Sequence, residues 1–470
     1  MWVSIVAGVL VCLEIIAIYF SWRAIQSART PQGSVGWVVF LVSAPYLAVP
    51  IYLFLGHHKY AGYINTRRDN QDLRDEILKW SAANAPVETG NLPDTFVYEK
   101  LAQLPACRGN SMELLIDGKA TFSALFEAID AAQSYILIQY YIVKEDGIGR
   151  QLRDHLISAA KRGVTVRMLV DGVGSLKLPK SYLRQLTEGG VRIIDPKTVR
   201  GPKTRFQLNL RNHRKTVVID GKIGFTGGVN VGDEYLGLDE KFGQWRDTHA
   251  KFRGPVVSQL QLIFVEDWYW ATEENLIEHL AWETDHEEAN MTALLVPTGP
   301  GDTMEGGSLM FYTAIAAAKK RIWIASPYFV PDEVILTALK HAALRGVEVK
   351  LLVPDVVDHK IPWLAAFAYF DEVIEAGCEI WRYNQGFMHQ KVFLVDDTLA
   401  AVGTSNLDNR SFRLNFETMV LLFDAEAAAS VETMLEADFS RAFRLTRSLE
   451  AQPHRIRIGA PVARLFSPLL

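Results

Sequence analysis

The clearest motif in this sequence reads Asn212-His213-Arg214-Lys215-Thr216-Val217-Val218-Ile219-Asp220. Its template is His, any residue, Lys, four residues and Asp, and it returns in Met388-His389-Gln390-Lys391-Val392-Phe393-Leu394-Val395-Asp396. An Asn follows each template, at Asn230 and at Asn406, so that both His-to-Asn intervals are 17 residues. One match would be a weak motif, but two matches with the same downstream Asn indicate a duplicated functional unit.

Each template places its His and its Lys just before a short apolar run. Residues 216–219 and 392–395 are rich in β-branched side chains and are typical of buried strands. Because side chains alternate along an extended backbone, the His and the Lys of each template share one face. A neutral imidazole beside an ammonium suits attack on phosphorus, with the ring as nucleophile and the cation on the phosphate oxygens. We therefore interpret two pairs as catalytic: His213 with Lys215, and His389 with Lys391.

The paired templates resemble the phospholipase D superfamily. Within it, residues 209–215, 227–235, 245–249 and 406–412 resemble bacterial cardiolipin synthases, and the likeness extends over nearly the whole chain. The resemblance implies an α/β fold of two phospholipase D-like lobes, related by an internal pseudo-twofold repeat, with both templates at one cleft. It also implies a phosphatidyltransferase that makes cardiolipin and glycerol from two phosphatidylglycerol molecules through a phosphatidyl-histidine intermediate. Members of the superfamily favour His213 as the nucleophile and His389 as the general acid–base, although the sequence alone leaves these roles open.

An internal repeat sets the expected domain organisation. From residue 111 onward apolar strands alternate with amphipathic helices, which predicts α/β lobes, and residues 160–166 are matched by residues 343–349. We expect strands over 135–143 and 164–170 with a helix over 149–162 between them. The predicted units are two transmembrane helices in residues 1–56, a juxtamembrane linker in 57–110, and lobes in 111–290 and 291–470.

Several polar residues near the templates allow two interpretations each. Asn230 and Asn406 are predicted to bind substrate phosphate oxygens, or to serve in turns and helix caps. Asp220 and Asp396 complete the templates and are counted with the catalytic residues. They also end their strands, and Asp220-Gly221 predicts a hairpin turn, so a turn role is an equal alternative.

A nucleophilic histidine needs an acceptor on its other ring nitrogen. The resemblance makes Asp247 and Glu417 these orienting carboxylates. They lie 34 residues after His213 and 28 residues after His389, respectively. The alternative is a surface ion pair, for example between Arg246 and Asp247.

The N-terminal region predicts a membrane anchor. Residues 1–20, apart from Glu14, and residues 34–55 are apolar stretches long enough to cross a hydrocarbon layer of about 30 Å as helices. A cleaved signal peptide is the alternative for the first stretch, which lacks a basic start. Four basic residues follow the second stretch and two lie between the stretches, so the positive-inside rule favours a multi-pass inner-membrane protein with cytoplasmic lobes.

The composition restricts the classes of partner and cofactor that we expect for this chain. A net charge of −5 argues against a nucleic-acid binder, and three scattered cysteines give neither a disulfide framework nor a metal-ligand spacing. We expect no metal and no cofactor, since no Walker-type phosphate loop occurs either. Residues 196–215 carry seven basic residues and no acid, which suits anionic phospholipids at a bilayer or an ordinary solvated surface.

Four functions remain to be separated. The first is the phosphatidyltransferase, for which phosphatidylethanolamine is an open alternative as the second lipid. The second is a phospholipase D-type hydrolase that would use the same residues. The acidic net charge disfavours a nuclease of the superfamily. The two complete templates disfavour a catalytically inactive membrane scaffold.

Overall fold

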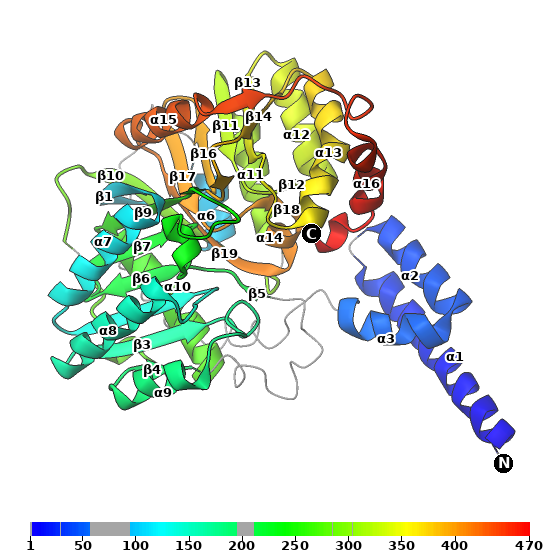
Figure 1. Cartoon of the computed structure of the whole chain (residues 1–470), viewed down its shortest axis with the longest axis horizontal. Coiled ribbons are helices and arrows are strands. Elements are labelled where there is room, and N and C mark those ends of the chain that lie inside the picture. The colour runs from blue at the N-terminus through cyan, green and yellow to red at the C-terminus, as the bar shows by residue number, and fades with distance from the viewer. Residues whose placement is uncertain (1, 29, 57–94, 195–210, 284, 303) are drawn as a thin grey trace.

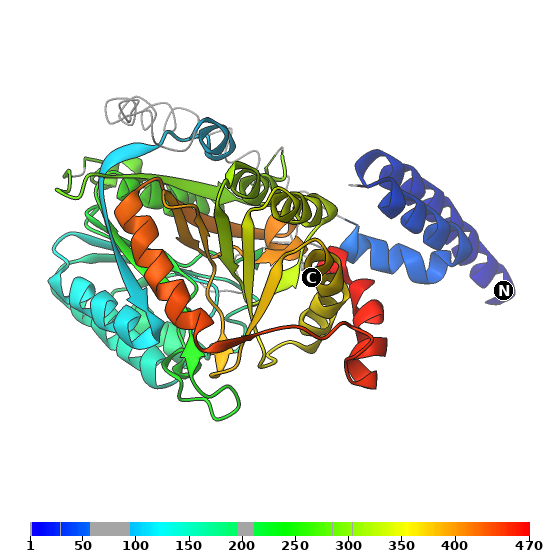
Figure 2. The ribbon, with the colours of Figure 1, turned by 90° about the horizontal axis from the view of Figure 1, so that it is seen from above.

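The structure is a computed structural model that describes residues 2–28, 30–56, 95–194, 211–283, 285–302 and 304–470. An α/β body forms most of the molecule, and the N-terminal helices lie to one side of it (Figure 1). Figure 2 shows the same arrangement from above. Most of the predicted juxtamembrane linker 57–110 and most of the basic segment 196–215 fall outside the described residues.

Two consecutive sets of elements build the body, preceded by α6 (Phe96–Ala102). The first set comprises β1 (Cys107–Ile116), α7 (Asp117–Ala131), β2 (Tyr135–Tyr140), α8 (Gly147–Lys161), β3 (Thr165–Val170), α9 (Lys180–Glu188), β4 (Arg192–Ile193), β5 (Arg211–Asn212), β6 (Thr216–Ile219), β7 (Ile223–Gly227), β8 (Trp245–Arg246), β9 (Thr248–Arg253) and α10 (Val256–Thr272). Short 3-10 helices η2 (Asp233–Leu236) and η3 (Ile277–His279) complete this half.

The second set repeats the first. It comprises β10 (Met291–Thr298), α11 (Gly306–Ala317), β11 (Arg321–Ala325), β12 (Phe329–Val330), α12 (Glu333–Leu344), β13 (Glu348–Pro354), α13 (Lys360–Glu375), β14 (Glu379–Tyr383), β15 (Phe387–Met388), β16 (Val392–Val395), β17 (Leu399–Gly403), β18 (Leu407–Asp408), α14 (Asn409–Arg413), β19 (Asn415–Leu422) and α15 (Ala425–Phe439). The chain then adds β20 (Ala442–Arg444), α16 (His454–Arg464) and η4 (Ser467–Leu469).

One sheet runs through both halves. Within the described residues its main path is β20-β14-β13-β11-β16-β17-β19-β10-β1-β9-β7-β6-β2-β3-β4. Strands β1 and β10 pair antiparallel at the centre, and the order outward from them is the same on both sides. The predicted repeat is therefore visible as matched strand order about this central pair.

Both faces of the sheet are buried, as the apolar template strands require. Every residue of β6 and of β16 is buried. Along β2, Leu137 packs into a core shared by both halves, whereas Ile136 and Ile138 pack into a second core on the other face. Helices α7 and α8 cover the first half, and α12 and α13 cover the second (Figure 1).

The predicted boundaries hold to within a few residues. Strand β2 ends at Tyr140 instead of residue 143, and α8 begins at Gly147 because Asp146 caps it by accepting from the Gly149 N–H. The predicted hairpin turn is present: β6 and β7 pair antiparallel, with Asp220 and Gly221 at φ of 53° and 68°. Two consecutive positive φ angles are the requirement of a type I′ turn.

The expected pair of membrane-spanning helices is not supported. Residues 34–55 form two helices instead of one, α2 (Pro31–Ser43) and α3 (Pro45–Leu55), of 13 and 11 residues. The chain breaks at Ala44 because the residue before a proline is disfavoured in helical conformation. Together with α1 (Trp2–Ser27) they share a small apolar core. Among the described residues, no helix has both the length and the apolar character needed to traverse a bilayer.

Candidate active site

The two histidine templates are held in place by backbone bonds between the lobes. Strand β5 of the first lobe pairs parallel with β19 of the second, and the His213 N–H donates to the Phe416 carbonyl at 3.0 Å. Strand β15 of the second lobe pairs with β8 of the first in the same way, and the His389 N–H donates to the Arg246 carbonyl at 2.8 Å. Each histidine is thus built into the edge of the opposite lobe.

The imidazole rings of the two histidines also bind residues of the opposite lobe. Nδ1 of His213 lies 2.9 Å from Oε2 of Glu417, and Nδ1 of His389 lies 2.9 Å from Oδ2 of Asp247. Both carboxylates are 0% exposed, so neither forms the surface ion pair that the sequence also allowed. Each lobe therefore supplies one histidine and the carboxylate that binds the histidine of the other lobe, a crossing that the sequence did not reveal.

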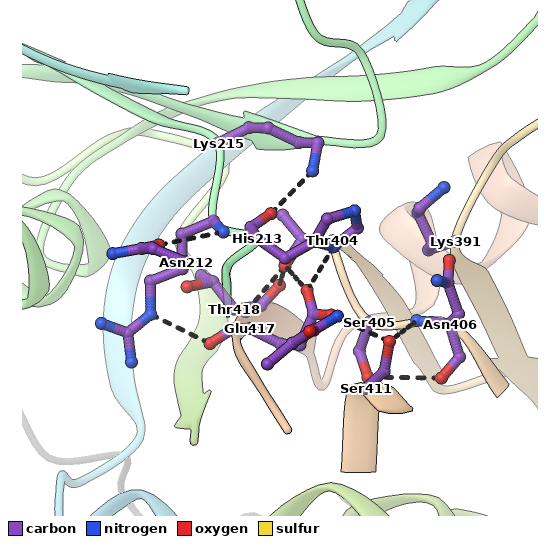
Figure 3. Close-up of polar contacts among 12 residues, drawn as sticks. Asn212, His213, Lys215, Lys391, Thr404, Ser405, Asn406, Ser411, Glu417 and Thr418 are labelled. Atoms are coloured by element: carbon purple, nitrogen blue, oxygen red, sulfur yellow. Dashed lines mark hydrogen bonds and ion pairs between the residues drawn. The ribbon is translucent and has the colours of Figure 1, made fainter. Parts of the chain in front are cut away.

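Hydrogen bonds fix both carboxylates. Glu417 also accepts from Thr404 Oγ1 at 2.7 Å, from Ser411 Oγ at 2.8 Å and from the Asn415 amide at 3.1 Å (Figure 3). Asp247 accepts from the Thr248 N–H at 2.8 Å. A Cβ on Gly228 would lie 1.9 Å from Asp247 Oδ1, so this glycine leaves room for the carboxylate. Both acceptors are held rigidly enough to fix the orientation of a ring.

The residue between His and Lys ties each template to the long helix of its own lobe. Arg214 donates to Asp267 on α10 at 2.7 Å, and Gln390 donates to Asp438 on α15 at 2.9 Å. Arg246, the suggested surface partner of Asp247, makes a buried pair with Asp438 instead, with Nε to Oδ1 at 2.7 Å.

The two lysines are buried beside the histidines. Lys215 is 0% exposed and its Nζ donates to the His213 carbonyl at 2.6 Å, while the Nζ of Lys391 donates to the His389 carbonyl. Figure 3 shows the Lys215 ammonium bound to the His213 carbonyl, with Lys391 drawn on the side of Asn406. Each ammonium has further N–H bonds to offer an anion between the lobes, because an ammonium carries three.

Charged groups of each template shift the pKa values of groups in the other template. Burial, with a smaller contribution from Lys215 and Lys391, lowers the pKa of His213 to about 4 against the opposing charge of Glu417. Burial and then Lys391 lower the pKa of His389 to about 4, and Lys215 contributes. Each histidine thus responds to the lysine of the other lobe, so the duplicated templates share one electrostatic environment. Both rings are neutral near pH 7, the state needed for a nucleophile or a base.

The pKa values of the two lysines and of the two carboxylates are shifted as well. Burial lowers the pKa of Lys215 to about 7 and that of Lys391 to about 8. Burial alone would raise the pKa of Glu417, but His213 and Lys215 lower it overall. His389 and Lys391 do the same for the pKa of Asp247. The site therefore keeps two carboxylates ionised next to cations that release protons easily.

The two asparagines lie in the site with unequal bonding. Asn230 accepts from the Ile142 N–H at 3.1 Å and donates to the Tyr235 hydroxyl at 2.8 Å. Asn406 donates to Asp408 at 3.3 Å, and its buried Oδ1 has no hydrogen-bond partner among the described residues. The side-chain oxygen and nitrogen of Asn230 thus both bind the protein itself, whereas Oδ1 of Asn406 can still accept a hydrogen bond from a ligand.

The two template aspartates lie at the other end of their strands. Asp220 accepts from the N–H groups of Gln133, Ser134 and Tyr135, each at 2.8 Å. Asp396 accepts in the same way from residues 319–321, at the start of β11. Both carboxylates bind the backbone at the start of a neighbouring strand, which is the turn role that the sequence left open.

Aromatic side chains that the sequence did not single out surround the rings. The Tyr141 ring meets His213 edge-on at 4.9 Å and lies 5.5 Å below the Lys215 ammonium. Trp245 and Tyr235 lie 5.5 and 6.3 Å from His389. The repeat offered one signal for Tyr141, because Tyr141-Ile142-Val143 matches Tyr328-Phe329-Val330 after the equivalent strand.

The chain is similar to known proteins over nearly its whole length. A family model described as cardiolipin synthase, PLD-like domain, matches residues 125–268 and 311–439. Cardiolipin synthase A of Pseudomonas entomophila (strain L48) is 42% identical over 466 residues, which cover 97% of this chain and 97% of that protein. Cardiolipin synthase A of Pseudomonas aeruginosa (strain UCBPP-PA14) is 42% identical over 469 residues, which cover 98% and 95%.

A solved structure shares the fold. The phosphatidylserine synthase of Haemophilus influenzae Rd KW20 superposes with a TM-score of 0.59 at 16% identity, over 80% of this chain and 99% of that one. The resemblance drawn from the two templates is thus confirmed by a family match and by full-length relatives. The chain belongs to the cardiolipin synthase family of phospholipase D-like proteins.

Proposed function

We propose that this protein is a membrane phosphatidyltransferase that makes cardiolipin and glycerol from two phosphatidylglycerol molecules. The observation that carries the proposal is the crossed pair of histidine–carboxylate bonds, His213 with Glu417 and His389 with Asp247. Two oriented imidazoles with two ammonium groups beside them match what a double displacement at one phosphorus needs.

The first step breaks the bond between phosphorus and the headgroup glycerol. Nε2 of one histidine attacks phosphorus, a phosphatidyl-histidine forms, and the other histidine gives a proton to the departing glycerol oxygen. Superfamily members favour His213 for the attack and His389 for the proton. Arrival of the anionic phosphate raises the low pKa of the second ring, because an opposite charge stabilises the imidazolium.

The second step reverses the first with a new alcohol. The unprotonated histidine now removes the proton from a hydroxyl of the second phosphatidylglycerol, and that oxygen attacks phosphorus and releases the first histidine. Lys215 and Lys391 bind the non-bridging oxygens throughout, and Asn406 offers a further polar contact. Bonds between phosphorus and oxygen are exchanged one for one, so no nucleotide is consumed.

The N-terminal helices support action at a bilayer. Ile15, Ile18 and Val42 are exposed by 62%, 67% and 66%, and they lie among several other exposed apolar side chains on α1–α3. Apolar surface of this kind is typical of membrane contact. We propose that these helices attach the enzyme to the inner membrane, with the lobes on the cytoplasmic side as the loop charges predict.

Vesicles of defined composition test the proposal. Purified protein with phosphatidylglycerol vesicles, without nucleotide, should release cardiolipin and free glycerol in equal amounts. Phosphatidic acid as the main product would favour the hydrolase, and no product would favour an inactive scaffold. Mixed vesicles that also contain phosphatidylethanolamine identify the second lipid.

A further inference from the structure

The last helix of the chain, α16, presents a stripe of large apolar side chains to solvent. The helical turn continues past its end, because the N–H groups of Leu465 and Phe466 donate to the carbonyls of residues 462 and 463. Spacings of three and four residues then keep the members of the stripe on one face. This outer stripe comprises four residues that are exposed by 54%, 54%, 78% and 49%: Ile458, Val462, Leu465 and Phe466.

The opposite face of α16 is fixed to the body of the protein. Ala460 is fully buried there, and a Cβ added to Gly459 would lie 3.3 Å from the Leu364 side chain on α13. Just beyond α16, the Tyr369 hydroxyl of α13 donates to Ser467 Oγ at 2.7 Å. The helix is therefore held by its small residues, and the outer stripe points away from the body.

The charge beside the outer stripe is positive. Residues 451–470 contain three arginines and no acidic residue, whereas the whole chain has a net charge of −5. Arg455 and Arg457 are exposed, and Arg457 Nη2 lies 3.1 Å from His454 Nδ1. Neither arginine forms an ion pair within the part of the chain that the structure describes. Free cations beside an apolar stripe match the headgroups and the acyl chains of an anionic bilayer.

A bilayer fits this surface better than a second copy of the chain does. A symmetric pair of copies would bring the same patch together from both sides, so that arginines would face arginines. In both views α16 also lies at the side of the body where the N-terminal helices lie (Figures 1 and 2). The proposed function already assigns these helices to the membrane.

Short contacts connect this part of the chain with the histidine site. The backbone N–H of Arg410 on α14 donates to a Leu470 oxygen at 2.6 Å. In the next residue, Ser411 Oγ donates to Glu417, the carboxylate that binds His213. The site therefore has a fixed position relative to the C-terminal turn that follows α16.

We propose that the outer face of α16 is a bilayer-binding surface, in which the outer stripe enters the acyl chains near the headgroups and Arg455 and Arg457 bind lipid phosphates. An amphipathic helix of this kind buries its apolar face about 5–10 Å into the boundary between headgroups and chains. The inference rests on the proposed function and deepens it, because it names a second contact with the membrane. Two separate contacts hold the body in one orientation, so that the site meets the lipid headgroups.

Fluorescence quenching in vesicles tests this surface without recourse to catalysis. In a Cys12→Ser background the two remaining cysteines are buried, so that Val462→Cys can be labelled selectively with an environment-sensitive fluorophore. The full chain is reconstituted in vesicles of phosphatidylglycerol and phosphatidylcholine that contain a doxyl-labelled lipid. Leu344→Cys is the matched control. Leu344 is 75% exposed at the end of α12, next to Arg345, which donates to the Ala318 carbonyl at the end of the sheet away from the histidines.

We expect quenching at position 462 to be at least about threefold stronger than at position 344, and a doxyl group near the headgroup to quench more than one at the chain end. Arg455→Gln combined with Arg457→Gln should weaken quenching at position 462 at least about twofold, because the anionic headgroups lose their cations. Lys161→Gln, at an exposed cation that ends α8, should leave the quenching unchanged.

Absence of quenching at position 462, or equal quenching at both positions, would overturn the surface. A label at position 462 that becomes buried without lipid, in a chain that sediments as a dimer, would assign the face to a second copy and would overturn it too. Failure of the proposed function looks different, because the label would still be quenched while the unlabelled protein formed no cardiolipin.

Discussion

The exchange of carboxylates between the lobes gives a sharp prediction for Glu417→Gln. Oε2 of Glu417 accepts from His213 Nδ1 and from Thr404, and Oε1 accepts from Ser411 and Asn415. Either orientation of the new amide turns its NH₂ toward groups that now donate. An amide NH₂ that faces His213 forces Nδ1 to accept, which leaves the reactive Nε2 protonated and unable to attack phosphorus or remove a proton.

The magnitude follows from the bond that is lost. A hydrogen bond to a charged group contributes about 1.5–3 kcal/mol, which is about 10- to 150-fold in rate. The wrong tautomer adds to this loss, and the comparable change in a Ser-His-Asp triad costs about 10⁴-fold. We therefore expect kcat to fall by roughly 10²- to 10⁴-fold, with KM nearly unchanged because Glu417 is buried behind the ring and does not face substrate.

Initial rates of glycerol release from phosphatidylglycerol vesicles measure this effect. Glu379→Gln is the matched control, because Glu379 lies on β14 and bonds Trp381 and Arg444 away from the templates. Nitrogen-15 NMR of labelled histidines adds a readout of position, since Glu417→Gln should change the tautomer of His213 and leave that of His389. A kcat within about threefold of wild type, or a change at His389 alone, would refute the crossed arrangement.

Four further predictions follow from the same geometry. His213→Ala and His389→Ala should each lower cardiolipin formation by at least about 10³-fold, and either variant that retains wild-type activity would remove that ring from the mechanism. Because burial lowers the pKa of Lys215 to about 7 and that of Lys391 to about 8, kcat/KM should fall as pH rises through this range. A rise in kcat/KM between pH 7 and 9, about the window of these titrations, would contradict the phosphate clamp. Asp220→Asn should lower the free energy of unfolding by about 1–3 kcal/mol in denaturant titrations with kcat within about twofold, since its three backbone bonds lie away from the rings; loss of kcat at unchanged stability would contradict this. EDTA should leave the rate unchanged, because ammonium groups supply the positive charge at phosphorus, and strong inhibition would contradict the proposed chemistry.

The duplicated strand and its two histidines were predictable because their signals are local. Residues 216–219 and 392–395 are short runs typical of buried strands, and the His–Lys spacing places both side chains on one face. The matched segments at 160–166 and 343–349 predicted the repeat, and the strand order shows it. Asp220-Gly221 predicted the hairpin turn between β6 and β7, since only a few residue types accept two positive φ angles.

The partners of the histidines were not predictable in the same way. Asp247 and Glu417 were identified, but sequence spacing does not show that each binds the histidine of the other lobe, because the exchange depends on how β5 and β8 pair across the junction. The break at Ala44 was not predicted because residues 34–55 were treated as one uncharged apolar stretch, although Pro45 carried the local signal. Tyr141 lies just beyond its strand, where only the packed structure brings its ring to His213.

The central claim is that two lobes place two imidazoles at one phosphorus and that one of them carries the phosphatidyl group between lipids. Acid-quenched enzyme, taken within the first turnover on phosphatidylglycerol and analysed by peptide mass spectrometry, tests it most directly. We predict one phosphatidyl adduct per chain, on the peptide that holds either His213 or His389, with an equal burst of free glycerol. Glycerol release and cardiolipin formation at full rate with no adduct on either peptide would contradict the account.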